Sequence, residues 1–231
     1  MKIYSIPREK KYAGHFKNDM SIFSDVMKSL SEFGYEFGNI PKECDAAIVM
    51  SREYNTLKNL NVFDGSAINN IPSIIDCMYN RKKIFELLEA NGINIPPTYE
   101  EKGEITANEK CVIKNMHSHG KKADTKILEA GEEYDGPLSN YLVQKYIIGK
   151  EITFYGIGDK ILIKGGKNKK IERICKNLNK IIGLEIFGGQ IILNSSYYVI
   201  DINDWPAFDN IPNAGLKIAS HIDKLIKKRR L

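Results

Sequence analysis

The sequence predicts a mixed fold, with an α/β unit at the N-terminus followed by α+β pieces with antiparallel sheets. Two hairpin patterns carry the second part of this prediction. Strand-like runs at 152–157 and 160–164 flank Gly158-Asp159, and runs at 188–193 and 197–202 flank a short polar turn. The first part rests on short apolar strand candidates that alternate with an amphipathic helical segment.

The N-terminal α/β unit is expected to begin with a strand at 2–6. A helix follows, with Asp19 as its candidate N-cap and Gly34 as its end. Residues 46–50 have the continuous apolar character of a buried strand, and residues 69–72 (Asn-Asn-Ile-Pro) are a turn signal. The expected buried face of the helix consists of Ile22, Phe23, Val26, Met27, Leu30 and Phe33.

Further helices and strands are expected in the rest of the chain. One helical pattern covers 73–91 and ends at Gly92, and another covers 168–182 with Asn168 as candidate N-cap. The remaining elements are strands at 111–114, 125–128 and 141–147 and a closing helix at 214–228.

Composition excludes several classes of protein. The chain has 231 residues, 42% hydrophobic and 27% charged, which excludes a disordered chain and suits one large domain or two to three small subdomains. No apolar run reaches the roughly 18 residues that a membrane-spanning helix needs. The first ten residues lack the apolar core of a signal peptide, so we expect a cytoplasmic protein without membrane partners.

The net charge of +5 is mild, and part of it lies in the basic tail at 227–230. A solvated helix end accounts for that tail better than a nucleic-acid patch does, so we do not expect nucleic-acid binding. The cysteines are scattered without a CxxC pair, which argues against a zinc site or disulfide framework and favours small core residues. They are Cys44, Cys77, Cys111 and Cys175.

A lysine at a strand end is the first candidate for chemistry. Lys114 is followed by a loop, 117–122, that contains His117, His119 and Gly120. Such a lysine can place its ammonium on a phosphate, while a glycine-containing loop closes backbone N–H groups over it. The loop is not a GxxxxGK[ST] P-loop. The alternative is a surface lysine before an ordinary loop.

The segment 142–151 is the second candidate. Adenine needs one backbone donor and one acceptor in a plane between apolar walls, and the backbone of 144–147 can supply both, with Tyr146 or Ile147 as a wall. Glu151 is placed to accept ribose hydroxyls. A plain strand with a turn at Gly149 is the alternative.

A pair of oxygen ligands near the C-terminus is the third candidate. Asp201 and Asn203 face the same side of a strand because side chains alternate, and Gln190 lies on the partner strand of that hairpin. Oxygen ligands of this kind suit Mg²⁺ bound together with phosphate. The alternative is a strand-ending turn. We expect Trp205 and Phe208 to be packing residues.

The start of the helix before Gly92 is basic, with Arg81, Lys82 and Lys83 in succession. Such a group can approach phosphates or form an exposed face. Together with the segments above, this order resembles the ATP-grasp superfamily, from about residue 40 to about residue 225. Within it the chain looks closest to ligases that add glutamate to ribosomal protein or related peptides, and is more distantly similar to inositol polyphosphate kinases.

The resemblance implies that two α+β lobes grip ATP after a small α/β pre-ATP-grasp domain. The implied domains are 1–79 for the N-terminal domain, 80–143 for the small lobe and 144–231 for the large lobe with the metal site. Mg²⁺ and ATP are the implied cofactors. A carboxylate and an amine, as small molecules or peptides, are the implied substrates.

The resemblance also implies roles for single residues. Lys114 and either Arg81 or Lys82 would contact phosphate, and Lys164 would face the γ-phosphate, with Lys114 and Lys164 as the catalytic pair. The other roles are adenine binding by Gln144, Lys145, Tyr146 and Ile147, ribose binding by Glu151, and metal binding by Asp201, Asn203 and Gln190.

Two features depart from the family pattern. Gln190 stands where the family has an acidic residue, so we expect one tight and one weaker metal site, or a slow or inactive enzyme. The segment 165–173 is shorter than the substrate loop of larger members. Substrate recognition would then rest on the first 80 residues, a partner, or a second copy in a homodimer.

Three functions therefore compete. The first is an ATP-dependent carboxylate–amine ligase that works through an acyl phosphate. The second is a small-molecule kinase of the same fold, in which His117, His119, Lys121 and Lys122 would serve a polyanionic substrate. The third is a non-catalytic nucleotide-binding module, motivated by Gln190.

Overall fold

The structure is a computed structural model of the chain. It describes residues 1–12, 16–53, 60, 67–70, 78, 80–99, 109–116, 125–132, 137–209 and 211–229. The predicted phosphate loop with His117, His119, Lys121 and Lys122 lies outside the described residues, as does Cys77. In the described part of the chain, none of the helices combines the length and apolar character that crossing a bilayer requires.

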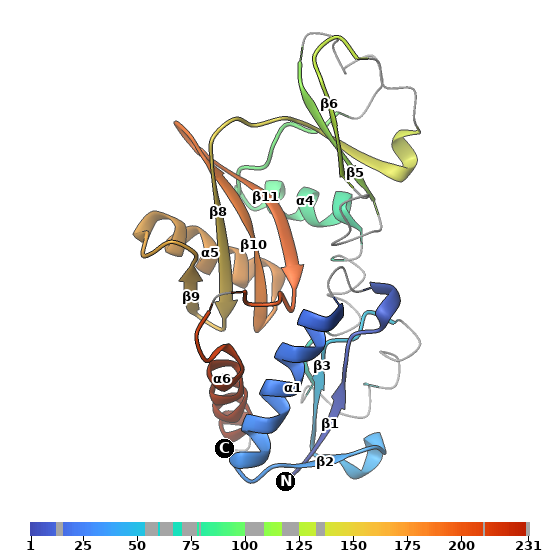
Figure 1. The fold of residues 1–231 in the computed structure, drawn as a ribbon, viewed down its shortest axis with the longest axis vertical. Coiled ribbons are helices and arrows are strands. Elements are labelled where there is room, and N and C mark those ends of the chain that lie inside the picture. The colour runs from blue at the N-terminus through green and yellow to red at the C-terminus, as the bar shows by residue number, and fades with distance from the viewer. Residues whose placement is uncertain are drawn as a thin grey trace.

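Three sheets follow one another along the long axis of the molecule (Figure 1). The N-terminal sheet is parallel, with strand order β2-β1-β3-β4. Its strands are β1 (Lys2–Ile6), β2 (Glu36–Gly38), β3 (Ala46–Val49) and β4 (Ala67–Asn69), with short 3-10 helices η1 (Lys10–Tyr12) and η2 (Pro41–Glu43) between them.

The other two sheets are antiparallel, as predicted. The large sheet has the order β11-β10-β8-β9 and the small sheet the order β6-β5-β7. The large sheet consists of β8 (Lys150–Ile157), β9 (Lys160–Ile163), β10 (Ile186–Leu193) and β11 (Tyr197–Asp204). The small sheet consists of β5 (Cys111–Asn115), β6 (Thr125–Leu128) and β7 (Tyr141–Lys145), with η6 (Leu138–Asn140) before β7.

In the described ranges, four longer helices pack around these sheets: α1 (Phe16–Glu32), α4 (Arg81–Ala90), α5 (Lys169–Ile182) and α6 (Ala214–Arg229). The N-cap prediction for α5 is confirmed, because the side chain of Asn168 accepts hydrogen bonds from the N–H groups of Lys170 and Ile171. These bonds satisfy two of the donors that a helix start leaves open. Gly183 then ends the helix with a φ of 69°.

The first helix differs from its prediction at both ends. It begins at Phe16, so Asp19 lies within its first turn and is not its N-cap. Phe33, expected on the buried face, follows the helix end and is 42% exposed. Gly34 has a φ of 86°, and the next N–H, that of Tyr35, returns to the carbonyl of Leu30 at 3.1 Å. This left-handed turn carries the chain away from the face to which Phe33 was assigned.

A short strand replaces part of the predicted turn at 69–72. Residues 67–69 pair with β3 as β4, although Asn69 has a φ of 79°. The Asn69 side chain accepts a hydrogen bond of 2.6 Å from the Ile186 N–H of the large sheet. This buried bond between two sheets holds the asparagine in a conformation that few other residues adopt.

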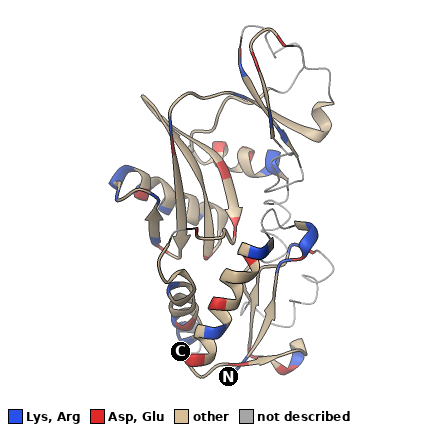
Figure 2. Ribbon diagram, viewed as in Figure 1, with Lys and Arg blue, Asp and Glu red and all other residues tan. Residues whose placement is uncertain are grey.

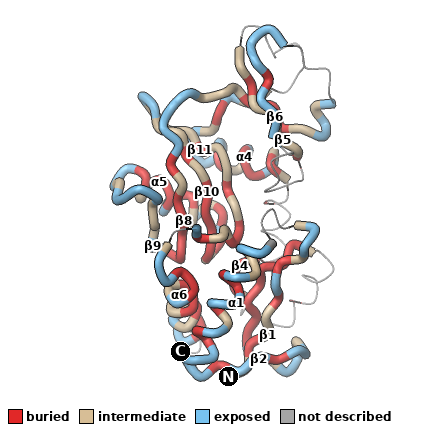
Figure 3. The backbone as a smooth tube through the Cα atoms, in the orientation of Figure 1, coloured by how far each residue is buried: buried red, intermediate tan, exposed pale blue. Residues whose placement is uncertain are grey.

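One apolar core joins the parallel sheet to the large sheet. Residues of α1 and α6, among them Leu30 and Ile222, pack with Trp205 and Phe208, which are both buried as predicted. A second core lies between the large sheet, α4 and α5. Figure 3 shows these buried positions along β1, β3, β10 and α6. The N- and C-terminal parts of the chain are thus packed together as one body, and the small sheet stands beside it.

Candidate functional site

One face of the large sheet carries a row of polar side chains. The register pairs Thr153 of β8 with Gln190 of β10, and Gln190 with Asp201 of β11. A bulge next to Gln190 leaves Ile200 without a register partner and brings Asp201 level with Gln190. Asn203 lies on the same face two residues later, and its amide donates to Oδ2 of Asp201 at 2.6 Å.

Lys114, from the small sheet, reaches across to this row. Its ammonium donates to the carbonyl oxygen of Ile200 at 2.7 Å and to Oε1 of Gln144 at 3.1 Å, and it lies 5.3 Å from the ring centre of Phe85. Burial lowers the pKa of Lys114 from its ordinary 10.5 to about 8, although the nearby Asp201 opposes that shift. The buried cation is held by neutral acceptors.

Gln144 fixes the position of that lysine. Its side chain is 1% exposed, and its amide donates to the Pro96 carbonyl at 3.4 Å and to the Thr98 hydroxyl at 3.3 Å. The amide oxygen therefore points toward Lys114. Gln144, expected at the adenine, thus binds the lysine through its side chain, and its backbone is paired with Val112 on one side and Thr98 on the other.

The start of α4 adds a second cation. Asn80 caps the helix by accepting from the N–H groups of Lys82 and Lys83. The Arg81 N–H donates to the Met116 carbonyl at 3.0 Å, and its guanidinium donates to the Asn115 carbonyl at 2.9 Å. These bonds tie the helix start to the end of β5 and bring Arg81 near Lys114. Figure 2 marks this basic helix start and the acidic positions along β11.

A cavity of about 570 Å³ lies between the small and large sheets. Like most ligand sites, it combines apolar walls with a few convergent polar groups. Pro96, Val112, Ile127 and Ile192 supply apolar walls. The predicted site residues that line this cavity are Arg81, Lys114, Gln144, Lys145, Tyr146, Ile147, Glu151, Gln190 and Asp201.

The edge of the cavity at 145–147 presents a backbone donor. The N–H groups of Lys145 and Tyr146 are bonded to the carbonyls of Pro97 and Lys110, at 2.9 and 2.8 Å. Within the described residues, the next N–H, that of Ile147, has no such bond. The Lys145 ammonium is bonded to Glu109 at 2.6 Å, so its charge is already paired beside the cavity.

Other predicted residues lie at the margins. Glu151 accepts a hydrogen bond of 2.5 Å from the Gln190 amide, which links the expected ribose ligand to the expected metal ligand. Lys82 pairs with Glu86, one helical turn later, at 3.9 Å. Lys164 is exposed and follows β9, where its N–H donates to the Thr153 carbonyl at 2.9 Å. The structure does not bring these two lysines to the wall of the cavity.

The donor set fits a divalent cation that shares its ligands with phosphate. Asp201 and Asn203 offer a carboxylate and an amide oxygen on one sheet face, with Gln190 beside them. Among the described residues, no group of three or more acidic, histidine or cysteine side chains could enclose a metal by itself. A site with few protein oxygens suits Mg²⁺, which keeps waters and binds substrate phosphates.

The whole architecture matches solved structures. It superposes on D-alanine–D-alanine ligase from Bacillus anthracis with a TM-score of 0.75 and 13% identity, over 100% of this chain and 98% of that one. The RimK domain ATP-grasp protein from Sphaerobacter thermophilus gives 0.70 and 12%, over 98% and 100%. The chain has the ATP-grasp fold. The predicted fold class is therefore confirmed.

A third solved structure agrees on the ATP-grasp fold. The ATP-grasp ligase PsnB, solved with a precursor peptide and AMPPNP, gives a TM-score of 0.71 at 14% identity, over 97% of this chain and 98% of that one. Inositol-tetrakisphosphate 1-kinase of Danio rerio is 32% identical over 63 residues, which are 26% of this chain and 16% of that protein. The chain thus aligns with a small part of that kinase. No family model matches the sequence.

A second cavity of about 340 Å³ adjoins the first in this ATP-grasp fold. Both are lined by Gln190 and Asp201, so they meet at the candidate metal ligands. None of the motifs described above predicted the second cavity. Its other polar lining comes from the N-terminal unit, from the large sheet and from the chain after β11. These residues are Arg8, Tyr12, Asp19 and Arg52, then Thr153, Asn203 and Asp204, and finally Asp209.

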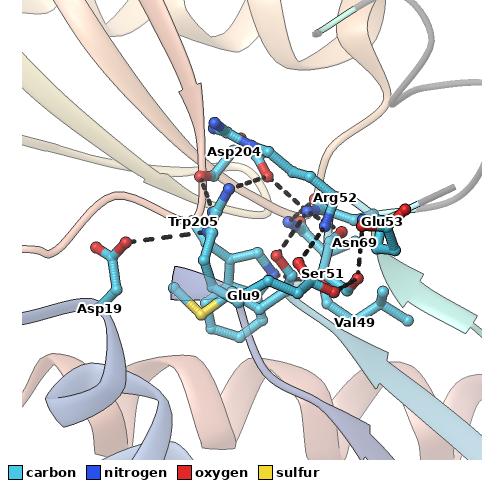
Figure 4. A network of polar contacts seen from close by, with 12 residues as sticks. Glu9, Asp19, Val49, Ser51, Arg52, Glu53, Asn69, Asp204 and Trp205 are labelled. Carbon is cyan, nitrogen blue, oxygen red and sulfur yellow. Dashed lines mark hydrogen bonds and ion pairs between the residues drawn. The ribbon is translucent and has the colours of Figure 1, made fainter. Parts of the chain in front are cut away.

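A buried ion cluster forms one wall of this second cavity (Figure 4). Arg52 binds Oδ1 of Asp204 through Nε at 2.8 Å and also through Nη2. Arg8 donates to the Asp204 carbonyl at 2.8 Å, and the Asn70 amide donates to Oδ2 of Asp204 at 2.5 Å. Burial alone would raise the pKa of Asp204, but Arg52 and Arg8 hold it well below its ordinary value.

The signal for this cluster was present in the sequence. Arg8, Arg52 and Asn70 each follow the end of a parallel strand, β1, β3 or β4, by one to three residues. The carboxyl ends of parallel strands meet at one edge of a sheet, and ligands of open α/β sheets bind there. A search for polar residues directly after buried strands would have found all three.

Proposed function

We propose that the protein is an ATP-dependent carboxylate–amine ligase. One observation supports this most: Lys114, Glu151 and Asp201, from three different strands, line a single cavity between the two antiparallel sheets. The fold of the chain is also that of D-alanine–D-alanine ligase and of a peptide ligase solved with AMPPNP. Fold alone does not define an activity, so the proposal rests on the residues of the site.

The cavity offers a place for each part of ATP. The free N–H of Ile147 and the carbonyl of Lys145 would bind adenine, between apolar walls such as Ile127 and Ile192. Glu151 would accept the ribose hydroxyls. Lys114, Arg81 and the candidate metal ligands would hold the phosphates.

The reaction joins two substrates at the expense of one phosphate bond. A carboxylate oxygen of the acid attacks the γ-phosphorus of ATP, the bond to the bridging oxygen breaks, and ADP leaves. The amine then attacks the carbonyl carbon of the acyl phosphate, the carbon–oxygen bond to phosphate breaks, and inorganic phosphate leaves with loss of a proton from nitrogen. Binding and orientation carry these steps, without a covalent protein nucleophile.

Residues of this chain stabilise charge on the transferring group. Lys114 holds a buried ammonium at the phosphate end, and Arg81 adds a second cation there. Mg²⁺ held by Asp201 and Asn203 would supply charge neutralisation of the phosphate oxygens. Lys164 continues the row of Thr153, Gln190 and Asp201 across the sheet, so its flexible side chain has a short path to the γ-phosphate.

The experiment is a coupled assay with product identification. The protein is incubated with ATP, Mg²⁺ and pools of amino acids and short peptides, and phosphate release is measured together with new amides by mass spectrometry. Lys114→Met and Asp201→Asn should abolish both signals, while Lys176→Met on the exposed face of α5 should not change them. If AMPPNP binds but ATP is converted to ADP with none of the acids in the pools, the proposal is contradicted.

A kinase of the same fold is the second candidate, since part of the chain aligns with inositol-tetrakisphosphate 1-kinase. The products separate the two functions. A phosphorylated alcohol without free phosphate indicates a kinase, and free phosphate with a new amide indicates a ligase.

A further inference from the structure

The outward side of α5 and the turn before it carry a concentrated positive charge. The segment 159–180 contains eight basic and two acidic residues. Its excess of six is larger than the net charge of +5 of the whole chain, so the remaining residues together are close to neutral. Figure 2 marks basic positions along α5. A charge concentrated in this way attracts anionic partners to one side of the molecule.

Four of these cations form a row, which we call the basic stripe. It consists of Lys169, Arg173, Lys176 and Lys180. Their spacing of four, three and four residues puts them on one face of the helix, over a length of about 16 Å. All four are exposed, because α5 buries its apolar face in the core that it shares with the large sheet.

The stripe has no counter-charge of its own. Among the described residues, none of its four cations forms an ion pair, whereas Lys82–Glu86 on α4 and Lys227–Asp223 on α6 are paired at 3.9 and 2.9 Å. Like charges three or four residues apart destabilise a helix, and Lys169 lies at the N-terminal end, where the helix dipole opposes a cation. The stripe therefore costs stability, and the fold does not explain it.

The stripe is also separate from the nucleotide cavity. Of the described residues that line the two cavities, none belongs to α5. The helix packs in the same core as Ile152 and Ile191, whose neighbours Thr153 and Gln190 point to the opposite face of the large sheet. A partner bound to the stripe is therefore not the nucleotide.

The surroundings of the stripe favour a polypeptide over a lipid surface or a nucleic acid. Among the described residues of 159–180, no large hydrophobic side chain is exposed to enter a bilayer, and the segment contains no aromatic residue on which a base could stack. Three of the four cations are lysines, although arginine matches the geometry of phosphate better.

An open sheet edge lies beside the stripe (Figure 1). β9 is the last strand in the order β11-β10-β8-β9, and no other described strand pairs with its outer edge. The side-chain amide of Asn179, on α5, donates to the Gly158 carbonyl, in the turn before β9, at 3.1 Å. An unpaired edge accepts the backbone of another polypeptide as an added strand, which neither a lipid nor a nucleic acid provides.

We propose that the basic stripe and the β9 edge form a docking surface for an extended segment of a partner protein that is rich in aspartate and glutamate. Alternate side chains of an extended segment recur about every 7 Å, and the steps of the stripe are about 4.5–6 Å, a difference that flexible lysine side chains bridge. The carboxylates would compensate the stripe, and the backbone would pair with β9. This inference goes beyond the proposed function and does not depend on it.

The test measures binding of labelled peptides to the full chain by fluorescence anisotropy at physiological ionic strength. A peptide with glutamate at alternate positions should bind, and its affinity should fall as salt is added. The same peptide with glutamine should bind at least tenfold more weakly, because it lacks the charge-assisted contacts. Methylating the backbone nitrogens of the glutamate peptide should also weaken binding, because they could no longer donate to β9. Equal binding of the glutamine or the methylated peptide would overturn the inference, as would tighter binding of a DNA duplex or of phosphatidylserine vesicles.

A variant with alternating charge separates docking from folding. Lys169→Glu combined with Lys176→Glu leaves the other two cations of the stripe in place, so each like-charged pair becomes an oppositely charged pair. This variant should lose at least tenfold in affinity for the glutamate peptide and should melt at the same temperature as the wild type or higher. The matched control, Lys42→Glu combined with Lys224→Glu, makes the same change in net charge at exposed positions elsewhere and should bind the peptide as the wild type does.

Three outcomes of these variants would overturn the inference. If the stripe variant kept its affinity, or the control lost as much affinity as the stripe variant, the stripe would not be the docking surface. A lower melting temperature of the stripe variant would assign the stripe to the stability of the fold.

Discussion

Two buried charges in this molecule are treated in opposite ways. Lys114 is held by the neutral oxygens of Gln144 and Ile200, and its pKa falls to about 8. Asp204 is surrounded by Arg8, Arg52 and the Asn70 amide, and its pKa is held low. The first charge lacks a full counter-charge and faces a cavity, and the second is compensated in place. The comparison indicates that Lys114 binds a ligand and that Asp204 stabilises the fold.

The largest effect is expected from a substitution that breaks the ion cluster around Asp204. Asp204→Ala leaves Arg8 and Arg52 buried together without their carboxylate, which should cost about 3–5 kcal/mol of unfolding free energy. Urea denaturation followed by circular dichroism measures this loss. Lys114→Met should leave the unfolding free energy unchanged or raised, because it removes a buried charge without a full partner. A similar loss in both variants would refute the distinction between the two charges.

The next effect concerns ligand binding. Lys114→Met should weaken AMPPNP by about thirtyfold, since a hydrogen bond to a charged group contributes about 2 kcal/mol. Calorimetry of the folded variant measures the affinity directly. Arg52→Lys, which alters the structural cluster, should have a much smaller effect on AMPPNP than on stability. Wild-type affinity in Lys114→Met would show that the phosphates do not reach this lysine.

The depressed pKa of Lys114 predicts a pH dependence with a defined sign. Between pH 8 and its ordinary pKa of 10.5, Lys114 is neutral in the folded protein and charged in the unfolded chain, so its contribution to stability rises with pH across this window. Triphosphate raises the pKa, so AMPPNP binding should take up protons in the same window and weaken as pH rises. Calorimetry in buffers of different ionisation enthalpy counts these protons.

The matched control for that experiment is Lys114→Arg, which stays charged throughout. Its proton uptake should vanish. Equal uptake in the variant and the wild type would assign the titration to another group.

The smallest expected effect concerns the metal ligand that departs from the family pattern. Gln190→Glu adds a carboxylate beside Asp201, worth about 1 kcal/mol at the water-like limit, so Mg²⁺ should bind about fivefold tighter in the presence of AMPPNP. Without Mg²⁺ the new carboxylate lies against Glu151 and should lower stability slightly. A titration of Mg²⁺ monitored by AMPPNP affinity would contradict this placement if the variant and the wild type coincided.

Local patterns in the sequence predicted what local geometry decides. The i, i+2 spacing of Asp201 and Asn203 followed from strand alternation, and the place of Gln190 on the neighbouring strand followed from the hairpin pattern. The cap at Asn168 followed from side-chain chemistry. Phe33 was assigned wrongly because the helix ends one residue before it, and helix ends are the least certain part of any pattern.

The second cavity depends on distant parts of the chain and was not predicted. Arg8 and Arg52 contact Asp204, which lies 196 and 152 residues away, and periodicity carries no information about such pairs. The carbonyl of Ile200, the residue that the bulge leaves without a register partner, likewise accepts from Lys114, which lies 86 residues away. Site residues whose positions depend on one strand or one hairpin could be predicted from the sequence. Site residues that meet across two sheets could not.

The hydrogen bond from Lys114 to Ile200 also has a consequence for how the site fills. This bond joins the small sheet to the large one, so without nucleotide the ammonium holds the two sheets together. An arriving triphosphate would compete with the Ile200 carbonyl for the Lys114 ammonium. Nucleotide binding would then exchange a hydrogen bond between the two sheets for one to phosphate.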